Sequence, residues 1–242
     1  MGFRHYPSGV KGILICGGKG TRLLPLTAKT HKSLLPIGGK PMVLYPLQVL
    51  LDAGIKEIML ITGPEFAGDF MQCLGSGAKW NCEFTYRIQD EPRGIAHALG
   101  MAEAFADQEP VCALLGDNIF EDDLSKHIHN FSGKGAHLFL KEVTDPERFG
   151  VAEIQGERVM SLEEKPEHPK STLAVTGCYL YDPRCFGIIH DLAPSSRGEL
   201  EITDVSKKYL EWSELTATTL TGEWIDAGTH ESLRRAEELV RK

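Results

Sequence analysis

Four apolar runs in the first half of the chain are separated by segments of helical length, and this alternation restricts the fold more than any other feature. The expected strands cover residues 11–16, 57–62, 83–89 and 111–117. Between them, apolar residues recur at helical spacing over residues 41–54, 66–77 and 95–107. Strands that alternate with helices in this way favour parallel pairing. We therefore predict an α/β fold with a doubly wound, mixed, mostly parallel sheet.

After the strand-like run at 136–143, the rhythm changes to shorter strands and two or three helices. The shorter runs cover residues 149–154, 158–165, 173–182 and 215–220. This pattern indicates an inserted mixed-sheet portion that completes a cleft. We expect residues 1–10 to form a flexible arm, residues 11–242 a single domain, and residues 166–171 an exposed turn.

Composition excludes several classes of function. The net charge of −8 leaves no basic surface for nucleic acid, although a few cations in a cleft can still bind an anionic small molecule. No apolar stretch is long enough to span a bilayer, and the opening residues MGFRHYPSGVK lack the apolar centre of a secretory signal. We therefore expect a cytoplasmic protein without a membrane partner.

The six cysteines form no Cys-x-x-Cys pair, and several lie in apolar runs such as VCALLGD. Buried, reduced thiols are therefore favoured over disulfides or a zinc site. The nine histidines are not accompanied by a Ser or Cys in a nucleophile motif, which favours surface or packing roles for them.

A glycine-rich loop follows the first expected strand, at the sheet edge where ligands of doubly wound folds gather. Gly17, Gly18 and Gly20 allow backbone N–H groups to approach phosphate oxygens, and Arg22 supplies a planar fork that suits them. Leu23 stands where a dinucleotide-binding loop needs its third glycine, and Lys19 is not followed by the Ser or Thr of a P-loop. Taken alone, the loop is also compatible with a simple glycine turn carrying solvated cations.

The segments GGKGTRLLPLT and KSLLPIGGKPM together resemble the signature of the sugar-phosphate nucleotidyltransferases. Further segments agree in order along the chain, among them YRIQDEPRGIAHAL, LLGDNIF, DPERFGVAEI, LEEKP, AVTGCYLYD, RGELEITDV and WIDAGTHESL. They are similar to the glucose-1-phosphate thymidylyltransferase branch, from about Lys11 to the last residue. The resemblance implies a Rossmann-like sheet that carries a sugar-binding portion.

The reaction implied is attack by glucose 1-phosphate on the α-phosphorus of dTTP. A phosphate monoester has a second pKa of about 6 and is already ionised, so no general base is required. The resemblance assigns Arg22 and Lys32 to the triphosphate, with Gly17, Gly18, Gly20 and Thr21 in the same nucleotide-binding loop, and Lys165 to the sugar phosphate. Taken singly, a lysine at either position is more often simply exposed.

Two carboxylates are the predicted metal ligands. Asp117 follows an apolar strand, where it either caps a helix or binds a metal, and Asp226 in EWIDAGT presents the same choice. The resemblance implies that this pair holds Mg²⁺ against the α-phosphate and that Asp117 also belongs to the nucleotide site. Because the two residues are far apart in sequence, only the fold can bring them together.

The remaining predicted site residues follow from the resemblance. Gln89 and Gly94 are expected to read the pyrimidine base, since an amide can both donate to and accept from an imide edge. The sugar phosphate is expected to lie against Asn118, Gly150, Glu164, Thr176 and Gly177, with Asn118 reaching toward the ribose. Glu199 and Glu201 are interpreted as support for the sugar-binding portion.

Other readings stay open at this point. A uridylyltransferase, or an enzyme for another sugar 1-phosphate, differs by only a few contacts. A nucleotide-binding regulatory module without catalysis is disfavoured by the presence of all five predicted catalytic residues, and a nicotinamide oxidoreductase by the missing third glycine.

Longer members of the branch continue into extra C-terminal helices that help to form a second nucleotide site and a subunit interface. This chain ends 13 residues after Thr229, which is enough for one helix. The resemblance to a short form implies that feedback by a dTDP-sugar is weak or only competitive, and that any homo-oligomer uses a different surface.

Overall fold

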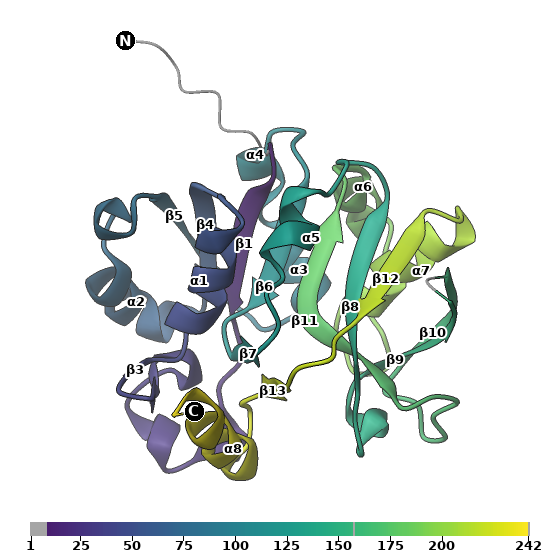
Figure 1. The fold of residues 1–242 in the computed structure, drawn as a ribbon. Helices are drawn as coiled ribbons and strands as arrows, with labels where there is room; N and C mark the ends of the chain where they lie inside the picture. Colours follow the sequence, from purple (N-terminus) through teal and green to yellow (C-terminus); the bar gives the residue numbers. More distant parts are fainter. Residues whose placement is uncertain (1–8, 157, 242) are drawn as a thin grey trace.

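The computed structural model describes residues 9–156 and 158–241, which fold around a nine-stranded sheet (Figure 1). Its strand order is β5-β4-β1-β6-β11-β8-β12-β10-β9, and two smaller sheets pair β13 with β7 and β2 with β3. The strands are β1 Lys11–Cys16, β2 Pro36–Ile37, β3 Lys40–Pro41, β4 Glu57–Thr62, β5 Glu83–Ile88, β6 Val111–Leu115, β7 Asn118–Phe120, β8 Ala136–Glu142, β9 Gly150–Gln155, β10 Arg158–Glu164, β11 Leu173–Tyr181, β12 Leu215–Thr219 and β13 Trp224–Asp226.

Helices cover both faces of the large sheet (Figure 1). The α-helices are α1 Leu44–Asp52, α2 Ala67–Leu74, α3 Ile95–Gly100, α4 Glu103–Ala106, α5 Ser125–His129, α6 Arg184–His190, α7 Ile202–Glu211 and α8 His230–Val240. Short 3-10 helices are η1 Thr21–Leu23, η2 Leu26–Ala28, η3 Lys32–Leu34, η4 Pro64–Phe66, η5 Ala78–Trp80 and η6 Pro146–Arg148.

The alternation of side chains along β1 explains why both faces need helices. Ile13 and Ile15 pack with α3, α4, α6 and α7 on one face, whereas Leu14 and Cys16 pack with α1, α2 and α5 on the other. Because successive strand residues point to opposite faces, an unbroken apolar run is buried only in a sheet covered on both sides. This two-sided burial holds the carboxyl ends of the strands, and the loops after them, in fixed positions.

The predicted mixed α/β fold is confirmed, with the parallel pairs concentrated in the first half of the chain. β5, β4, β1 and β6 are all parallel neighbours. The second half contains more antiparallel pairing than a mostly parallel sheet would have: β11 runs antiparallel to both β6 and β8, and β9 and β10 form a hairpin. The connection from Gln155 to Arg158 is too short for a parallel crossover, which needs a dozen or more residues.

Two local predictions need refinement. The helical segment expected at 95–107 is divided into α3 and α4 by a turn at Met101 and Ala102. Of the arm expected at 1–10, residues 1–8 lie outside the described residues, whereas Val10 is buried in the core.

A third hydrophobic cluster, distinct from the two sheet faces, lies between α8, β13 and the segment after the glycine loop. It includes Leu23, Ile37, Ile225 and Ala236. In Figure 1, α8 lies beside β3 and below β7, so the last helix packs on one of the first segments of the chain. Within the described ranges, no helix combines the length and apolar character needed to cross a membrane.

Candidate active site

The glycine loop after β1 has a backbone that requires glycine at two positions. Gly18 and Gly20 adopt φ values of +83° and +61°, in the left-handed region that disfavours other residues. The Thr27 hydroxyl donates to the Gly20 carbonyl at 2.8 Å, and a Cβ on Gly20 would lie 3.1 Å from the Thr27 methyl. The loop is therefore held compactly at the start of η1, which carries Thr21 and Arg22.

A cluster of charged side chains lies next to this loop. Asp117 follows β6, Asp226 ends β13, and Lys32 begins η3, where its ammonium forms an ion pair with Asp117. Burial raises the pKa of Asp117, but the Lys32 charge and the hydrogen bonds from Lys32 and Asn118 outweigh burial and hold it below its usual value. Burial likewise lowers the pKa of Lys32, yet Asp117 and Asp226 together raise it. The ion pair is therefore charged on both sides.

Asp226 differs from Asp117 in its environment. Burial, followed by the negative charge of Asp117, raises the pKa of Asp226 to about 6, even though Lys32, Arg22 and Arg148 favour its charged form. A Cβ on Gly228 would lie 2.9 Å from Arg22 Nη2 and 3.0 Å from Asp226 Oδ1, so Gly228 makes room for both groups. The structure thus brings Asp117, Asp226, Lys32 and Arg22 together from four separate segments.

Asn118 connects the two carboxylate segments through hydrogen bonds. Its Nδ2 donates to Asp117 at 3.2 Å, and its Oδ1 accepts from the Gly177 N–H at 3.0 Å and the Trp224 indole at 2.6 Å. Asn118 also pairs with Asp226 in the β7–β13 ladder. A Cβ on Gly177 would lie 2.5 Å from Asn118 Oδ1, so glycine is required there by packing. These bonds position both strands beside the cluster.

A cavity of about 400 Å³ opens beside the cluster and contains most of the predicted sugar-phosphate residues. The predicted residues that line it are Arg22, Asn118, Gly150, Glu164, Lys165, Gly177 and Asp226. Arg148 and Arg197 also line it and were not predicted. The cavity therefore places four cationic side chains near carboxylates, a surface that suits a polar, anionic ligand.

Glu164 lies at the centre of a hydrogen-bond network at one side of this cavity. Its Oε2 accepts from the Thr203 hydroxyl, and its Oε1 accepts from Arg197 at 3.2 Å. Arg197 also donates twice to Glu201, which supports the interpretation of Glu201 as a structural residue. Lys165 follows with φ +43°, a left-handed conformation that costs a non-glycine residue about 1–3 kcal/mol and often marks a functional position.

A second cavity of about 210 Å³ lies at the carboxyl ends of β1, β4 and β5 and contains the predicted base-reading amide. Gln89 lines it with Gly17 and Gly18, and Gln89 Nε2 lies 2.7 Å from Nδ1 of His97 on α3. Burial, followed by the Arg93 charge, lowers the pKa of His97. A neutral imidazole can accept from the Gln89 amide, which fixes the direction of that amide.

Some predicted residues border the cavities without lining them. Gly20, Thr21, Lys32 and Asp117 lie in the loop and the charged cluster beside the larger cavity. Gly94 has φ +100°, and a Cβ there would lie 2.4 Å from the Leu200 carbonyl, so this glycine allows α3 to approach the sugar-binding portion. On β11, Val175 and Gly177 line the cavity, whereas Thr176 between them is buried on the other face.

Two residues that line the larger cavity, Arg148 and Arg197, were missed by the sequence analysis, although both lie in segments that it had singled out. Arg197 precedes Gly198 in SSRGELEIT, a segment already noted, but its partner Glu164 is distant in the chain. Arg148 lies in DPERFGVAEI beside the predicted Gly150. In the described chain, no three His, Cys, Asp or Glu side chains gather closely enough for a complete metal centre, so a metal here depends on the Asp117 and Asp226 pair.

Comparison with known proteins finds relatives that align along most of this chain. The family model described as nucleotidyl transferase matches residues 11–242. Proteins named glucose-1-phosphate thymidylyltransferase are 44% identical in Neisseria meningitidis and 41% identical in Mycobacterium tuberculosis, in each case over 96% of this chain and 82% of the relative.

Solved structures show the same fold. A Bacillus anthracis protein provisionally described as a glucose-1-phosphate thymidylyltransferase, solved with sucrose, is 48% identical, with a TM-score of 0.92 over 96% of both chains. A UDP-glucose pyrophosphorylase bound to UDP-glucose is 25% identical, with a TM-score of 0.84 over 96% of this chain and 98% of that one.

Proposed function

This chain belongs to the nucleotidyl transferase family, and we propose that it transfers a thymidylyl group from dTTP to glucose 1-phosphate. The products are dTDP-glucose and pyrophosphate. Thymidylyltransferases at 40–44% identity over most of the chain support this choice of substrates. The neighbouring UDP-glucose pyrophosphorylase has the same fold at 25% identity, so UTP is the second candidate nucleotide.

The observation that carries the proposal is the meeting of distant segments at one cavity. Arg22 from the first loop, Glu164 and Lys165 from the end of β10, and Asp226 from the end of β13 all line the same 400 Å³ space. This transfer needs a cation that binds phosphate, a carboxylate that accepts from sugar hydroxyls and a carboxylate that binds a metal. The adjoining 210 Å³ cavity is the proposed site of the base.

In the proposed reaction, a phosphate oxygen of glucose 1-phosphate forms a bond to the α-phosphorus of dTTP. The bond between the α-phosphorus and the bridging oxygen to the β-phosphorus breaks, and that oxygen leaves with pyrophosphate. The attacking phosphate is already ionised, so the protein contributes alignment of two anions and stabilisation of the charge that develops.

The proposed roles of the cations follow from their positions. Arg22 holds the triphosphate, and Lys165 holds the phosphate of the sugar. Lys32 neutralises Asp117 in this structure, so binding the triphosphate requires Lys32 to exchange that carboxylate for phosphate oxygens. Glu164 accepts from sugar hydroxyls, with Gly150 and Gly177 leaving space, while Gln89 and the backbone of Gly94 contact the base.

The two aspartates fit a divalent cation. Burial, followed by the charge of Asp117, raises the pKa of Asp226, so two carboxylates share one buried site. Hard carboxylate oxygens are the ligands that Mg²⁺ prefers, and it is the ion we propose. When bound, Mg²⁺ would supply charge neutralisation at the α-phosphate. We further propose that residues 11–242 form one domain; a cytoplasmic location and a homo-oligomer stay predictions.

A pyrophosphate-release assay tests the proposal. The protein is supplied with Mg²⁺, each of dTTP, UTP, CTP, ATP and GTP, and either glucose 1-phosphate or glucosamine 1-phosphate. We expect the highest kcat/KM for dTTP with glucose 1-phosphate, UTP second, and much lower values for the purine nucleotides. Faster turnover with ATP or GTP would contradict a thymidylyltransferase, and faster turnover with UTP would favour the second candidate.

A further inference from the structure

His31 lies at the N-terminus of η3, and its ring is held firmly in place. The side chain is only 4% exposed. Its Nδ1 accepts a hydrogen bond from the Ser33 N–H at 3.1 Å, and its ring packs against Phe66 and Phe70 with centroid distances of 5.9 and 5.1 Å. These contacts leave the ring little freedom to turn.

The bond from Ser33 determines which ring nitrogen carries hydrogen. Burial, followed by the positive charge of Lys32, lowers the pKa of His31 to about 4, so the ring is neutral near pH 7. A neutral imidazole has one N–H, and because Nδ1 accepts, the hydrogen lies on Nε2. His31 therefore presents Nε2 as a donor.

That donor has no hydrogen-bond partner among the described residues, although it is fully buried. The carbonyls of Gly17 and Gly18 lie close enough to favour the protonated ring, but neither is a partner of Nε2. A buried donor without a partner is costly and uncommon in proteins, so such an atom indicates that something else accepts from it.

The position of His31 indicates what that acceptor is. His31 lines the 210 Å³ cavity together with Gly17, Gly18, Phe66 and Gln89, the amide proposed to read the base. The base of dTTP presents two carbonyl oxygens on either side of one N–H. One amide can accept from that N–H and donate to one carbonyl, and the two carbonyl oxygens together can accept several further hydrogen bonds, from the Gly94 backbone and from a donor inside this cavity.

We propose that His31 is a second base-reading residue, whose Nε2–H donates a hydrogen bond to a carbonyl oxygen of the pyrimidine. This inference rests on the proposed function, because it takes the 210 Å³ cavity as the site of the base. It adds to the proposed base site a hydrogen-bond donor that favours a base with a carbonyl group at this position. His31 thereby contributes to the choice of nucleotide, whereas the neighbouring Lys32 acts on charge.

Two substitutions separate this role from the structural role of the ring. His31→Asn keeps an acceptor near the Nδ1 position for the Ser33 N–H but removes the donor at Nε2. His31→Gln places an amide N–H near the Nε2 position but loses the acceptor for Ser33. Each variant therefore keeps one of the two hydrogen bonds of His31 and removes the other.

The experiment measures KM for both substrates, calorimetric affinity for dTTP and for tripolyphosphate, and Tm. We expect His31→Asn to weaken dTTP binding and raise its KM about 5- to 30-fold, with Tm close to wild type. We expect His31→Gln to keep the KM for dTTP within about threefold while lowering Tm. Affinity for tripolyphosphate and KM for glucose 1-phosphate should stay unchanged in both.

Three results would overturn the inference: unchanged dTTP affinity in His31→Asn, an equal loss of tripolyphosphate affinity, or equal loss of dTTP affinity in both variants together with lower Tm. The wild-type protein tests the proposed function separately, through its turnover of dTTP with glucose 1-phosphate. If the wild type binds dTTP without turnover and His31→Asn loses that binding, the proposed reaction fails while the role of His31 stands.

Discussion

At the scale of single residues, the two aspartates of the charged cluster have pKa values shifted in opposite directions. Asp117 is held ionised by Lys32 and Asn118, whereas the pKa of Asp226 is raised to about 6 by burial and by Asp117. Sequence motifs predicted both aspartates but could not distinguish them, because the difference comes from partners brought in by η3, η1 and β7.

Replacing Asp226 with Asn should therefore stabilise the protein while lowering its activity. Because the folded-state pKa lies above the usual aspartate value of 3.8, stability is greatest below that value and is lost as pH rises through about 6. Asp226→Asn removes that loss, so Tm at pH 7.5 without divalent metal should rise, by about 2–4 °C for each kcal/mol gained. In the presence of Mg²⁺, kcat should fall roughly a thousandfold.

Thermal unfolding between pH 4 and pH 8 gives the comparison. The wild-type Tm should decline more steeply than that of Asp226→Asn as pH rises from about 4 to 6, and Mg²⁺ should raise Tm in the wild type only. An aspartate that the cluster needs for stability would give the opposite order, with a lower Tm in the variant at pH 7.5.

His97 offers a second test at the residue scale. Its Nδ1 lies 2.7 Å from Gln89 Nε2, so His97→Ala should free the amide to turn and weaken recognition of the base. Loss of one such bond predicts a KM for dTTP about three- to tenfold higher, with kcat and the KM for glucose 1-phosphate nearly unchanged. His190→Ala, which removes an exposed histidine bonded to Glu103, is the matched control. Equal KM increases for both substrates would indicate a general structural effect instead.

At the scale of elements, the sequence predicted strands well where they are apolar on both sides. β1 and β4 have the predicted bounds, since an unbroken apolar run suits a buried parallel strand and few alternatives. The pairing of β11 with β6, β8 and β9 could not be read from the sequence, because it depends on which segments meet after the chain turns back. For the same reason Arg197, whose partner Glu164 lies on another element, was missed.

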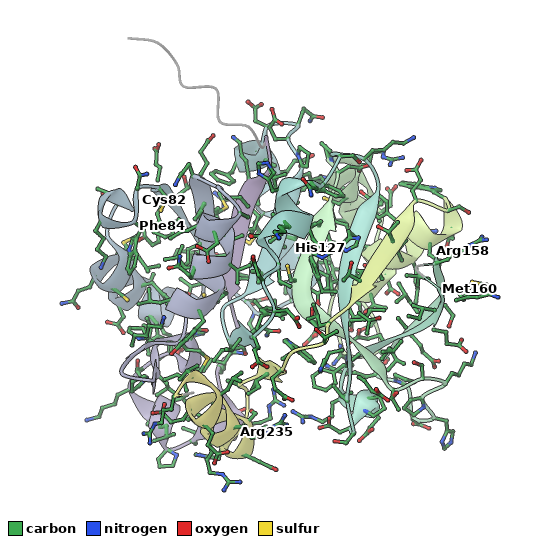
Figure 2. The ribbon with its side chains drawn as sticks, viewed as in Figure 1. Cys82, Phe84, His127, Arg158, Met160 and Arg235 are labelled. Carbon is green, nitrogen blue, oxygen red and sulfur yellow. The ribbon has the colours of Figure 1, made fainter. Side chains whose placement is uncertain are left out.

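The C-terminal helix supports the loop that carries the site cations. His230 on α8 lies 2.9 Å from the Leu24 carbonyl, Glu237 accepts from the Gly38 N–H at 2.7 Å, and Ala236 packs in the same cluster as Leu23. Figure 2 shows Arg235 on the same helix, and its guanidinium donates to Glu223 at 3.3 Å. The helix begins with a reciprocal cap in which Thr229 and Ser232 bond each other's backbone N–H groups.

Weakening this cap should therefore also affect nucleotide binding at the proposed site. Thr229→Ala should lower the free energy of unfolding by about 1 kcal/mol, which corresponds to a Tm lower by about 2–4 °C. Because His230 on α8 bonds the Leu24 carbonyl directly after η1, we also expect a modest rise in the KM for dTTP. Thr172→Ala is the control, since the Thr172 hydroxyl is exposed and bonds Glu142 at 3.4 Å. A lower Tm without any change in KM would show that α8 stabilises the fold without positioning the loop.

At the scale of the whole molecule, the proposed site is shared between both halves of the sheet. The proposed base-reading segment is tied to the proposed sugar-binding portion through backbone bonds. The Leu200 N–H donates to the Arg93 carbonyl at 2.9 Å, and the Ala96 N–H donates to the Leu200 carbonyl at 3.2 Å. The antiparallel pairing of β11 with β6 joins the first half of the sheet to the second. Ligands that contact both halves should therefore stabilise them together.

We accordingly expect a single unfolding transition that ligands shift as a unit. At 100 times its Kd, a ligand that binds only the folded state adds about 2.7 kcal/mol, which for a chain of this size corresponds to roughly 5–11 °C in Tm. Calorimetric unfolding with Mg²⁺ and dTTP should show this shift as one transition without a shoulder. The reason is that one continuous nine-stranded sheet runs through both halves of the molecule. Glucose 1-phosphate alone should shift the same transition, although its proposed contacts lie on β9, β10 and β11. Two resolved transitions, of which dTTP moves one and glucose 1-phosphate the other, would mean that the halves fold independently and would contradict the proposed single domain.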